Sequence, residues 1–220
     1  MAHHAWNPPS PIPVEITTDR LCIRPYVSDD ADALFAAIEA DRASYLPWLP
    51  WVRVDNRTVG ECHYNIERFR RDATTPIATE YTYGVFRLDD GGLIGGVGFR
   101  PKDPGLHVAE VGYWVRPDGR GRGYCTEFTG HMISWLFRGQ ADGGWGLRRV
   151  DILMAADNVA SERIPQKLNM RLELAAVQER YVDDVGYHDT RGYGILAAEW
   201  DHDRHRARDD RAPGMLEPAD

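Results

Sequence analysis

The stretch VGYWVRPDGRGRGYCTEF, residues 111–128, decides the fold. Its first residues are apolar and typical of a strand, and its last residues begin an apolar pattern with helical spacing. Between them Gly119, Gly121 and Gly123 alternate with arginines, and a simple surface turn needs fewer glycines. The stretch therefore predicts a strand that leads through a tight glycine loop into a helix, with a ligand close to the backbone.

The chemistry of such a loop favours an anion. The first N–H groups of a helix have no partner within the helix, and its dipole adds partial positive charge there. Glycines let a ligand's oxygens approach these groups, and Arg120 and Arg122 add charge at the rim. The spacing matches neither GxxxxGK[ST] nor GxGxxG. We therefore expect the main-chain amides of residues 120–125 to bind a diphosphate; a glycine-rich turn with solvated arginines is the simpler alternative.

Composition narrows the class of protein. The chain has 220 residues, and 26 Lys and Arg against 34 Asp and Glu give a net charge of −8, which disfavours duplex nucleic acid as a partner. No apolar run is long enough to span a membrane. Cys22, Cys62 and Cys125 form no CxxC pair, so a disulfide framework or a zinc site is not expected, nor any other metal. Without the basic-then-apolar order of a signal peptide, a cytoplasmic protein is expected.

The pattern along the chain predicts three parts: an extended proline-rich arm over 1–15, a single domain over 16–200 and a charged flexible tail over 201–220. The domain is expected to be α+β, with a mixed, mostly antiparallel sheet flanked by helices in the order β-α-α-β-β-β-α-β-α-β-β. Ser28 predicts the cap of a helix over about 30–40.

Several segments resemble one family. Arg120-x-x-Gly123-x-Cys125 resembles the Q/R-x-x-G-x-G/A motif of the GCN5-related N-acetyltransferase (GNAT) superfamily, which binds the diphosphate of acetyl-CoA. The RimJ/RimL-type branch is the most similar, because four segments of the chain resemble it. They are EVGYWVRPDGRGRGYCTE (110–127), TTDRLCIRPY (17–26), LRRVDILMAADNVASERIPQKLNM (147–170) and ERYVDDVGYHDTRGYGILAAEW (179–200).

The resemblance covers about residues 16–200 and implies the GNAT fold. Two departures concern the predicted site: Cys125 stands where Gly or Ala is usual, and Asn169-Met170 where Gly-Phe is usual. Both are tolerable, since Cys is small and Asn adopts the left-handed conformation more readily than other non-glycine residues.

The resemblance implies an acyl-CoA-dependent N-acyltransferase. Such an enzyme would move an acetyl group from acetyl-CoA to a primary amine, either a protein N-terminus or a small molecule, by direct transfer in a ternary complex. Another donor such as succinyl-CoA is open, and a homodimer is compatible with the family. The alternatives are a non-catalytic CoA-binding sensor or interaction module and an antibiotic-modifying acetyltransferase.

The residues expected to bind acyl-CoA lie on the strand, the loop, the first helical turn and the later Asn-x-x-Ser segment. They are Tyr113, Trp114, Val115, Arg120, Gly121, Arg122, Gly123, Tyr124, Cys125, Thr126, Asn158, Ser161 and Lys167.

Two residues are candidates for the chemistry. Glu110 is expected to act as the base that deprotonates the amine, with a pKa raised by partial burial, or only to orient the acceptor. His107 is a weaker candidate. Ser161 is expected to hydrogen-bond the leaving thiolate, although it is also a common residue at a helix start. A packing role is expected for Cys125.

The segment YLPWLPWVRV, residues 45–54, concentrates the aromatic residues Tyr45, Trp48 and Trp51. The resemblance implies that this region forms the wall of an acceptor site, and aromatic rings suit contact with an amine or a peptide. A hydrophobic lid packed on the core is the alternative.

Overall fold

The computed structural model describes residues 5–10, 12, 15–75, 78–182 and 185–205. One eight-stranded sheet runs through it in the order β1-β2-β3-β4-β5-β6-β8-β7. Its strands are β1 (Ile16–Thr17), β2 (Leu21–Pro25), β3 (Tyr81–Arg87), β4 (Leu93–Asp103), β5 (Val108–Val115), β6 (Arg149–Ala155), β7 (Arg171–Val182) and β8 (Gly186–Leu196). All neighbouring strands are antiparallel except β5 and β6, which confirms the mixed, mostly antiparallel sheet.

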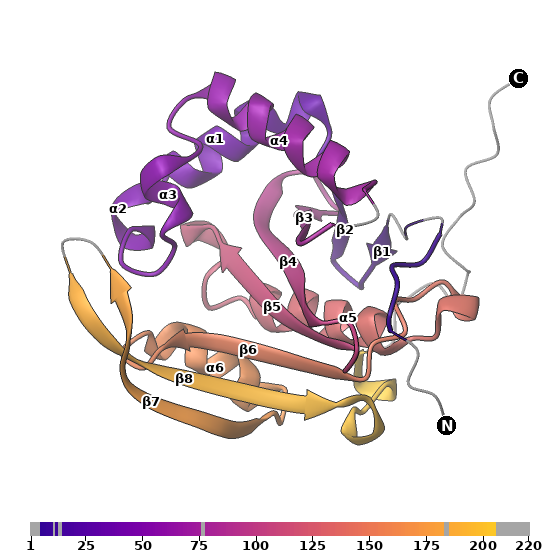
Figure 1. The fold of residues 1–220 in the computed structure, drawn as a ribbon. Coiled ribbons are helices and arrows are strands. Elements are labelled where there is room, and N and C mark those ends of the chain that lie inside the picture. Colours follow the sequence, from indigo (N-terminus) through magenta and orange to yellow (C-terminus); the bar gives the residue numbers. More distant parts are fainter. Residues whose placement is uncertain (1–4, 11, 13–14, 76–77, 183–184, 206–220) are drawn as a thin grey trace, which may run out of the picture.

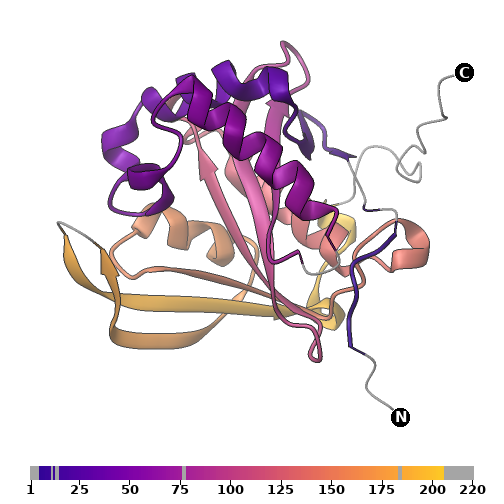
Figure 2. The ribbon, with the colours of Figure 1, turned by 45° about the horizontal axis from the view of Figure 1, so that its top comes forward.

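Helices cover both faces of this sheet. They are α1 (Ala31–Glu39), α2 (Arg42–Tyr45), α3 (Trp51–Val54), α4 (Val59–Ala73), α5 (Tyr124–Phe137) and α6 (Val159–Lys167). The first four gather on one side, over the half of the sheet that holds β3 and β4, and α5 lies on the other (Figures 1 and 2). The predicted order holds with two differences: the first predicted strand is divided into β1 and β2, and the short helices α2 and α3 are added where the aromatic segment lies.

Two apolar clusters hold the layers together. The larger lies between the sheet and α5, where the ring of Trp145 packs edge-on against Tyr81 and Phe99, each at 4.6 Å between centroids. The smaller joins α1 and α4 to the opposite face through Leu34, Ile66 and other buried apolar residues. Together they fix β5 between two packed faces.

Local sequence explains most helix and strand ends. Thr58 caps α4 by accepting a hydrogen bond from Glu61 N. Ser28 does not cap α1, contrary to expectation: its hydroxyl hydrogen-bonds the carboxylate of Glu67 on α4, and the residue before α1 is Asp30. Asn169, beyond α6, has φ 56°, so the expected left-handed conformation is confirmed.

The division into arm, domain and tail stays a prediction, because residues 1–4, 11, 13–14 and 206–220 lie outside the described residues. In the described part of the arm, Trp6 is buried and donates from Nε1 to Trp145 O at 2.8 Å. Among the described helices, none combines the length and apolar character needed to cross a membrane.

Candidate active site

A groove opens in the sheet where β5 and β6 separate. These parallel strands pair only over Val108–Glu110 and Arg149–Asp151. Beyond that point Val111–Val115 and Ile152–Ala155 line a cavity of about 500 Å³, which we call the donor groove. A parallel pair that diverges leaves backbone hydrogen-bonding groups without a strand partner on its inner edge.

The strand register identifies which groups face the groove. Arg116 N donates to Ile94 O at 2.8 Å, and β4 and β5 keep one register from there to Glu110. Backbone groups point alternately to the two sides of a strand, so the N–H groups of Val111, Tyr113 and Val115 point away from β4 and toward β6. The parallel pairing of Glu110 with Asp151 uses the N–H of Val111, so those of Tyr113 and Val115 are available to a ligand in the groove.

The glycine loop closes one end of the groove. Gly121 and Gly123 have φ 72° and 81°, a conformation that favours glycine. Within the described residues, the amides of residues 121–126 have no hydrogen-bond acceptor, since helical bonding in α5 begins with Glu127 N to Gly123 O. The amide of Arg120 donates instead to Pro117 O at 3.2 Å, so the cradle begins one residue later than expected.

The loop is braced from the β1–β2 turn. Arg20 and Thr18 bond the carboxylate of Glu127, and Arg20 donates to Arg122 O at 3.2 Å. The guanidinium of Arg20 also lies over the ring of Tyr124, 4.4 Å from its centroid. These contacts hold the free amides in place before any ligand arrives, which lowers the ordering cost of binding.

The charges around the groove differ from the expectation at Arg120. Its guanidinium bonds Asp41 at 2.7 Å and the Ser44 hydroxyl at 2.9 Å, so it ties the loop to the α1–α2 turn and contributes little free charge. Hydrogen bonds from Ser44 and Arg120 lower the pKa of Asp41.

Three free cations near the groove come from α6 and the loop. Arg163 and Lys167 line the groove, and Arg122 is exposed on the loop. None of the three has a carboxylate partner among the described residues. Sequence reasoning missed Arg163; its spacing of four residues from Lys167, which puts both on one helix face, could have indicated it.

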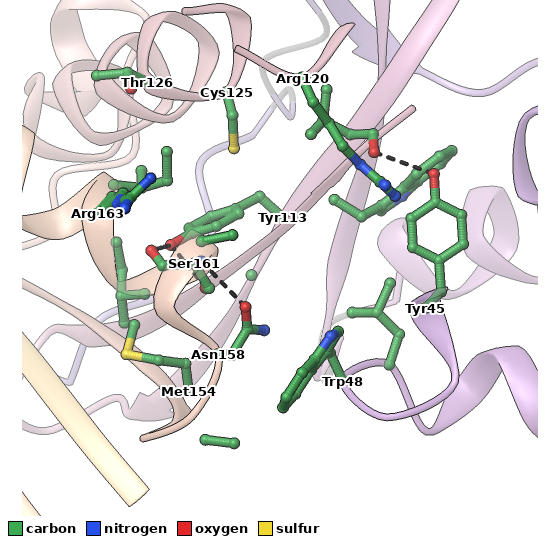
Figure 3. Close-up of a pocket in the computed structure, with 18 of the residues that line it drawn as sticks. Tyr45, Trp48, Tyr113, Arg120, Cys125, Thr126, Met154, Asn158, Ser161 and Arg163 are labelled. Carbon is green, nitrogen blue, oxygen red and sulfur yellow. Dashed lines mark hydrogen bonds between the residues drawn. The ribbon is translucent and has the colours of Figure 1, made fainter. Parts of the chain in front are cut away.

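Tyr113 and Ser161 meet in the middle of the groove (Figure 3). The phenol of Tyr113 donates to Ser161 O at 2.9 Å, and Ser161 Oγ donates to the phenol oxygen at 3.2 Å. The Ser161 carbonyl is free for this contact because Pro165, four residues later, has no N–H to donate to it. Pro165 within α6 thus serves the site, and burial raises the pKa of Tyr113.

Asn158 and Cys125 combine site and packing roles. Asn158 Oδ1 accepts from Ser161 N at 3.1 Å and caps α6, so the residue is a helix start that also borders the groove. Burial raises the pKa of the Cys125 thiol to about 12. The thiol therefore stays protonated at neutral pH, which favours the packing role over a nucleophilic one.

A second cavity, which we call the acceptor cleft, lies on the other face of β5 and has a volume of about 650 Å³. Glu110 lines it and forms an ion pair with Arg100 at 2.8 Å. Gly112 lies two residues further along the strand, and a side chain there would meet open space.

The two cavities share one border, which we call the junction. Seven residues line both of them: Trp48, Leu49, Gly112, Tyr113, Trp114, Leu153 and Arg180. A residue on a strand advances about 3.3 Å, so Glu110 lies one side-chain length from Gly112 at the junction. A substrate in the cleft can therefore meet a ligand in the groove beside Glu110.

The aromatic segment is partly wall and partly packing. Trp48 and Trp51 line the acceptor cleft. Tyr45 is buried and does not line that cleft; its ring packs on Trp114 at 5.9 Å, and its hydroxyl donates to Val115 O at 3.1 Å. Tyr45 also lines the donor groove, and the role of these residues as an acceptor wall stays a prediction.

The predicted acyl-CoA residues are largely brought together. Those that line the donor groove are Tyr113, Trp114, Val115, Arg120, Gly121, Gly123, Cys125, Thr126, Asn158, Ser161 and Lys167. Arg122 and Tyr124 belong to the loop but do not border the groove, and His107 lies in the β4–β5 turn outside both cavities. In the described ranges no three metal-ligating side chains cluster.

The chain matches a known protein family. The family model for the acetyltransferase (GNAT) domain matches residues 20–171, more than half of the chain. An uncharacterized N-acetyltransferase of Bacillus subtilis (strain 168), YoaA, is 27% identical over 82% of this chain and 96% of its own.

Solved structures agree in fold. RimL, a ribosomal L7/L12 α-N-protein acetyltransferase in complex with coenzyme A, superposes with a TM-score of 0.71 at 21% identity, over 83% of this chain and 97% of its own. Mycobacterium smegmatis RimJ in complex with a CoA-disulfide gives 0.72 at 20% identity, over 84% and 87%.

Proposed function

This chain belongs to the GNAT family of acetyltransferases, and we propose that it moves an acetyl group from acetyl-CoA directly to a primary amine. The amine would be a protein N-terminal α-amino group or that of a small molecule. The observation that carries the proposal is the junction, where a groove with free amides meets a cleft that holds a carboxylate.

The groove fits the acyl-CoA thioester in three ways. The free amides of residues 121–126 at the start of α5 suit the diphosphate, because a helix N-terminus offers N–H donors and partial positive charge. Arg163 and Lys167 supply charge for phosphate oxygens. The inward N–H groups of Tyr113 and Val115 suit the pantetheine arm and the thioester carbonyl oxygen, whose negative charge grows during attack.

The reaction then needs two proton transfers. The amine nitrogen attacks the thioester carbon, its proton passes to Glu110 directly or through one water, and the C–S bond breaks. The leaving sulfur takes up a proton through the linked hydroxyls of Ser161 and Tyr113, which lie 3.2 Å apart, and solvent supplies that proton. Each hydroxyl gives a proton only as it receives another, so neither is left as an anion.

Steady-state release of free thiol from acetyl-CoA tests the proposal, with a panel of amines and N-terminal peptides as acceptors. We expect Glu110→Gln to lower kcat by about 10²-fold or more while KM for acetyl-CoA changes little. Glu61→Gln is the matched control, because Glu61 pairs with Arg57 on an exposed helix end outside both cavities. Unchanged turnover by Glu110→Gln would remove Glu110 as the base; no turnover of any amine by the unmodified chain would refute the proposed reaction.

A further inference from the structure

Arg180 stands out among the seven junction residues because it is the one that carries a charge. It comes from β7, about 70 residues along the chain from the β5 residues that it faces across the junction. Its side chain is half-buried, and within the described residues it forms no hydrogen bond or ion pair. A half-buried guanidinium without a counter-charge is costly unless a ligand supplies one.

The other cations of the acceptor cleft are occupied. Arg100 pairs with Glu110; the guanidinium of Arg68 lies over the ring of Phe69, 5.2 Å from its centroid, and Arg68 does not border the donor groove. The cleft's remaining carboxylates, Asp55 and Glu80, line the cleft but do not border the donor groove. Positive charge is therefore left unbalanced at the junction itself, where the reacting groups meet.

The backbone before Arg180 is irregular in a way that directs its side chain. The β7–β8 register shifts between Ala176 and Arg180, and Gln178 has φ 49°, which is uncommon for a residue other than glycine. Asp189 holds this bulge by accepting from Gln178 N at 2.9 Å. The shift of two residues brings Arg180, in place of Gln178, opposite His188, and bulges are frequent beside active sites.

Strand β8, which pairs with β7, also holds the surroundings of Arg180 in place. His188 pairs with Arg180 across the ladder; its Nδ1 bonds Asp157 at 2.9 Å, and its ring packs on Trp48 at 6.3 Å between centroids. The ring is nine-tenths buried, and its Nε2 has no partner within the described residues. Arg180 thus lies opposite a fixed imidazole and shares the border of the two cavities with Trp48.

We propose that Arg180 binds a carboxylate carried by a substrate of the acyl transfer, so that this enzyme prefers a carboxylate-bearing partner at the junction. A planar guanidinium matches a carboxylate through two parallel hydrogen bonds, and flat aromatic walls leave room for a planar group. The carboxylate can come from the acceptor, as in an α-amino acid, or from the acyl group, as in succinyl-CoA. The inference rests on the proposed function.

The test separates these sources in full-length protein by following thiol release. One arm compares α-amino acids with the matching α-amides as acceptors of acetyl-CoA; the other compares succinyl-CoA with acetyl-CoA for a neutral amine. We expect the carboxylate form in one arm to have a kcat/KM about 10- to 100-fold higher, mainly through KM. Arg180→Gln should remove that preference by lowering kcat/KM for the carboxylate form far more than for the neutral form, and Arg180→Lys should keep part of it.

Arg171→Gln is the matched control, because Arg171 lies on the same strand, outside both cavities, in exposed ion pairs. It should keep the wild-type preference. Equal turnover of charged and neutral partners in both arms, or equal loss of both in Arg180→Gln, overturns the inference.

If no amine is acylated with either donor, the proposed function fails, and binding then decides the inference alone. Calorimetry would compare an α-amino acid and its amide on CoA-saturated protein, and succinyl-CoA with acetyl-CoA on free protein. Tighter binding of the carboxylate form that Arg180→Gln removes supports the inference, and equal binding of both forms in both comparisons overturns it.

Discussion

A methyl group at Gly121 would separate the cost of the loop's conformation from its role in binding. Gly121 has φ 72° and no atom within 4 Å of an added Cβ, so Gly121→Ala brings conformational strain and no clash. Gly91, in the β3–β4 turn, has φ 69° and is equally open, yet it lies outside both cavities. The two substitutions should therefore each destabilise the fold by about 1–2 kcal/mol.

Their effects on CoA binding should differ. A Cβ at Gly121 keeps a phosphate from the neighbouring amides, and a hydrogen bond to a charged group contributes about 1.5–3 kcal/mol. Loss of one such bond weakens binding by about 10- to 150-fold. Gly91→Ala should bind CoA like the unmodified protein.

Urea unfolding would measure the stability of both variants, and calorimetry with CoA would measure affinity at a temperature where each is folded. If Gly121→Ala keeps wild-type affinity, or if both variants lose affinity equally, the backbone cradle is the wrong explanation of the loop.

Three further substitutions or titrations probe other parts of the structure. Gly112→Val should fold normally, because a side chain at this strand position meets open space. It should narrow the junction, and so lower kcat/KM for the amine more than it lowers the affinity for CoA. A normal kcat/KM would show that the cavities do not meet there. Tyr113→Phe should lower the free energy of unfolding, measured in urea, by about 1 kcal/mol, because Ser161 loses its hydrogen bonds with the Tyr113 hydroxyl. It should also lower kcat. An unchanged kcat would exclude the hydroxyl pair from proton transfer. Burial, with His131 and Arg204, lowers the pKa of His205 from 6.5 to about 4, so the folded state favours the neutral ring. The stability that this contact contributes is complete above pH 6.5 and is lost as the pH falls toward 4. Hydrogen exchange around Trp200, which stacks on His205 at 5.0 Å between centroids, would detect the loss. Protection of these amides that stays the same over this pH range would contradict the prediction.

The features that sequence could predict are those fixed by short-range chemistry. The glycines of the loop and the left-handed Asn169 follow from backbone preferences of single residues, and both are present. The strand–loop–helix order around residues 111–128 follows from apolar spacing in the same way.

The features that the sequence could not predict depend on residues far apart in the chain. Arg120 forms an ion pair with Asp41, 79 positions away, and the Ser28 hydroxyl hydrogen-bonds Glu67 instead of capping α1. The contact of Tyr113 with Ser161 depends on a proline that frees one carbonyl, a detail that no local pattern contains. Arg180 lies opposite His188 because the register of β7 shifts by two residues before it.

The central claim is that the free amides from Gly121 to Thr126 receive the diphosphate of coenzyme A. Amide-resolved NMR of the labelled protein during titration with CoA tests it most directly. We expect these six amides to show the largest shifts, with Arg120 N–H, already bonded to Pro117, changing less. No saturable binding, or saturable binding that leaves these six signals in place, would contradict the account.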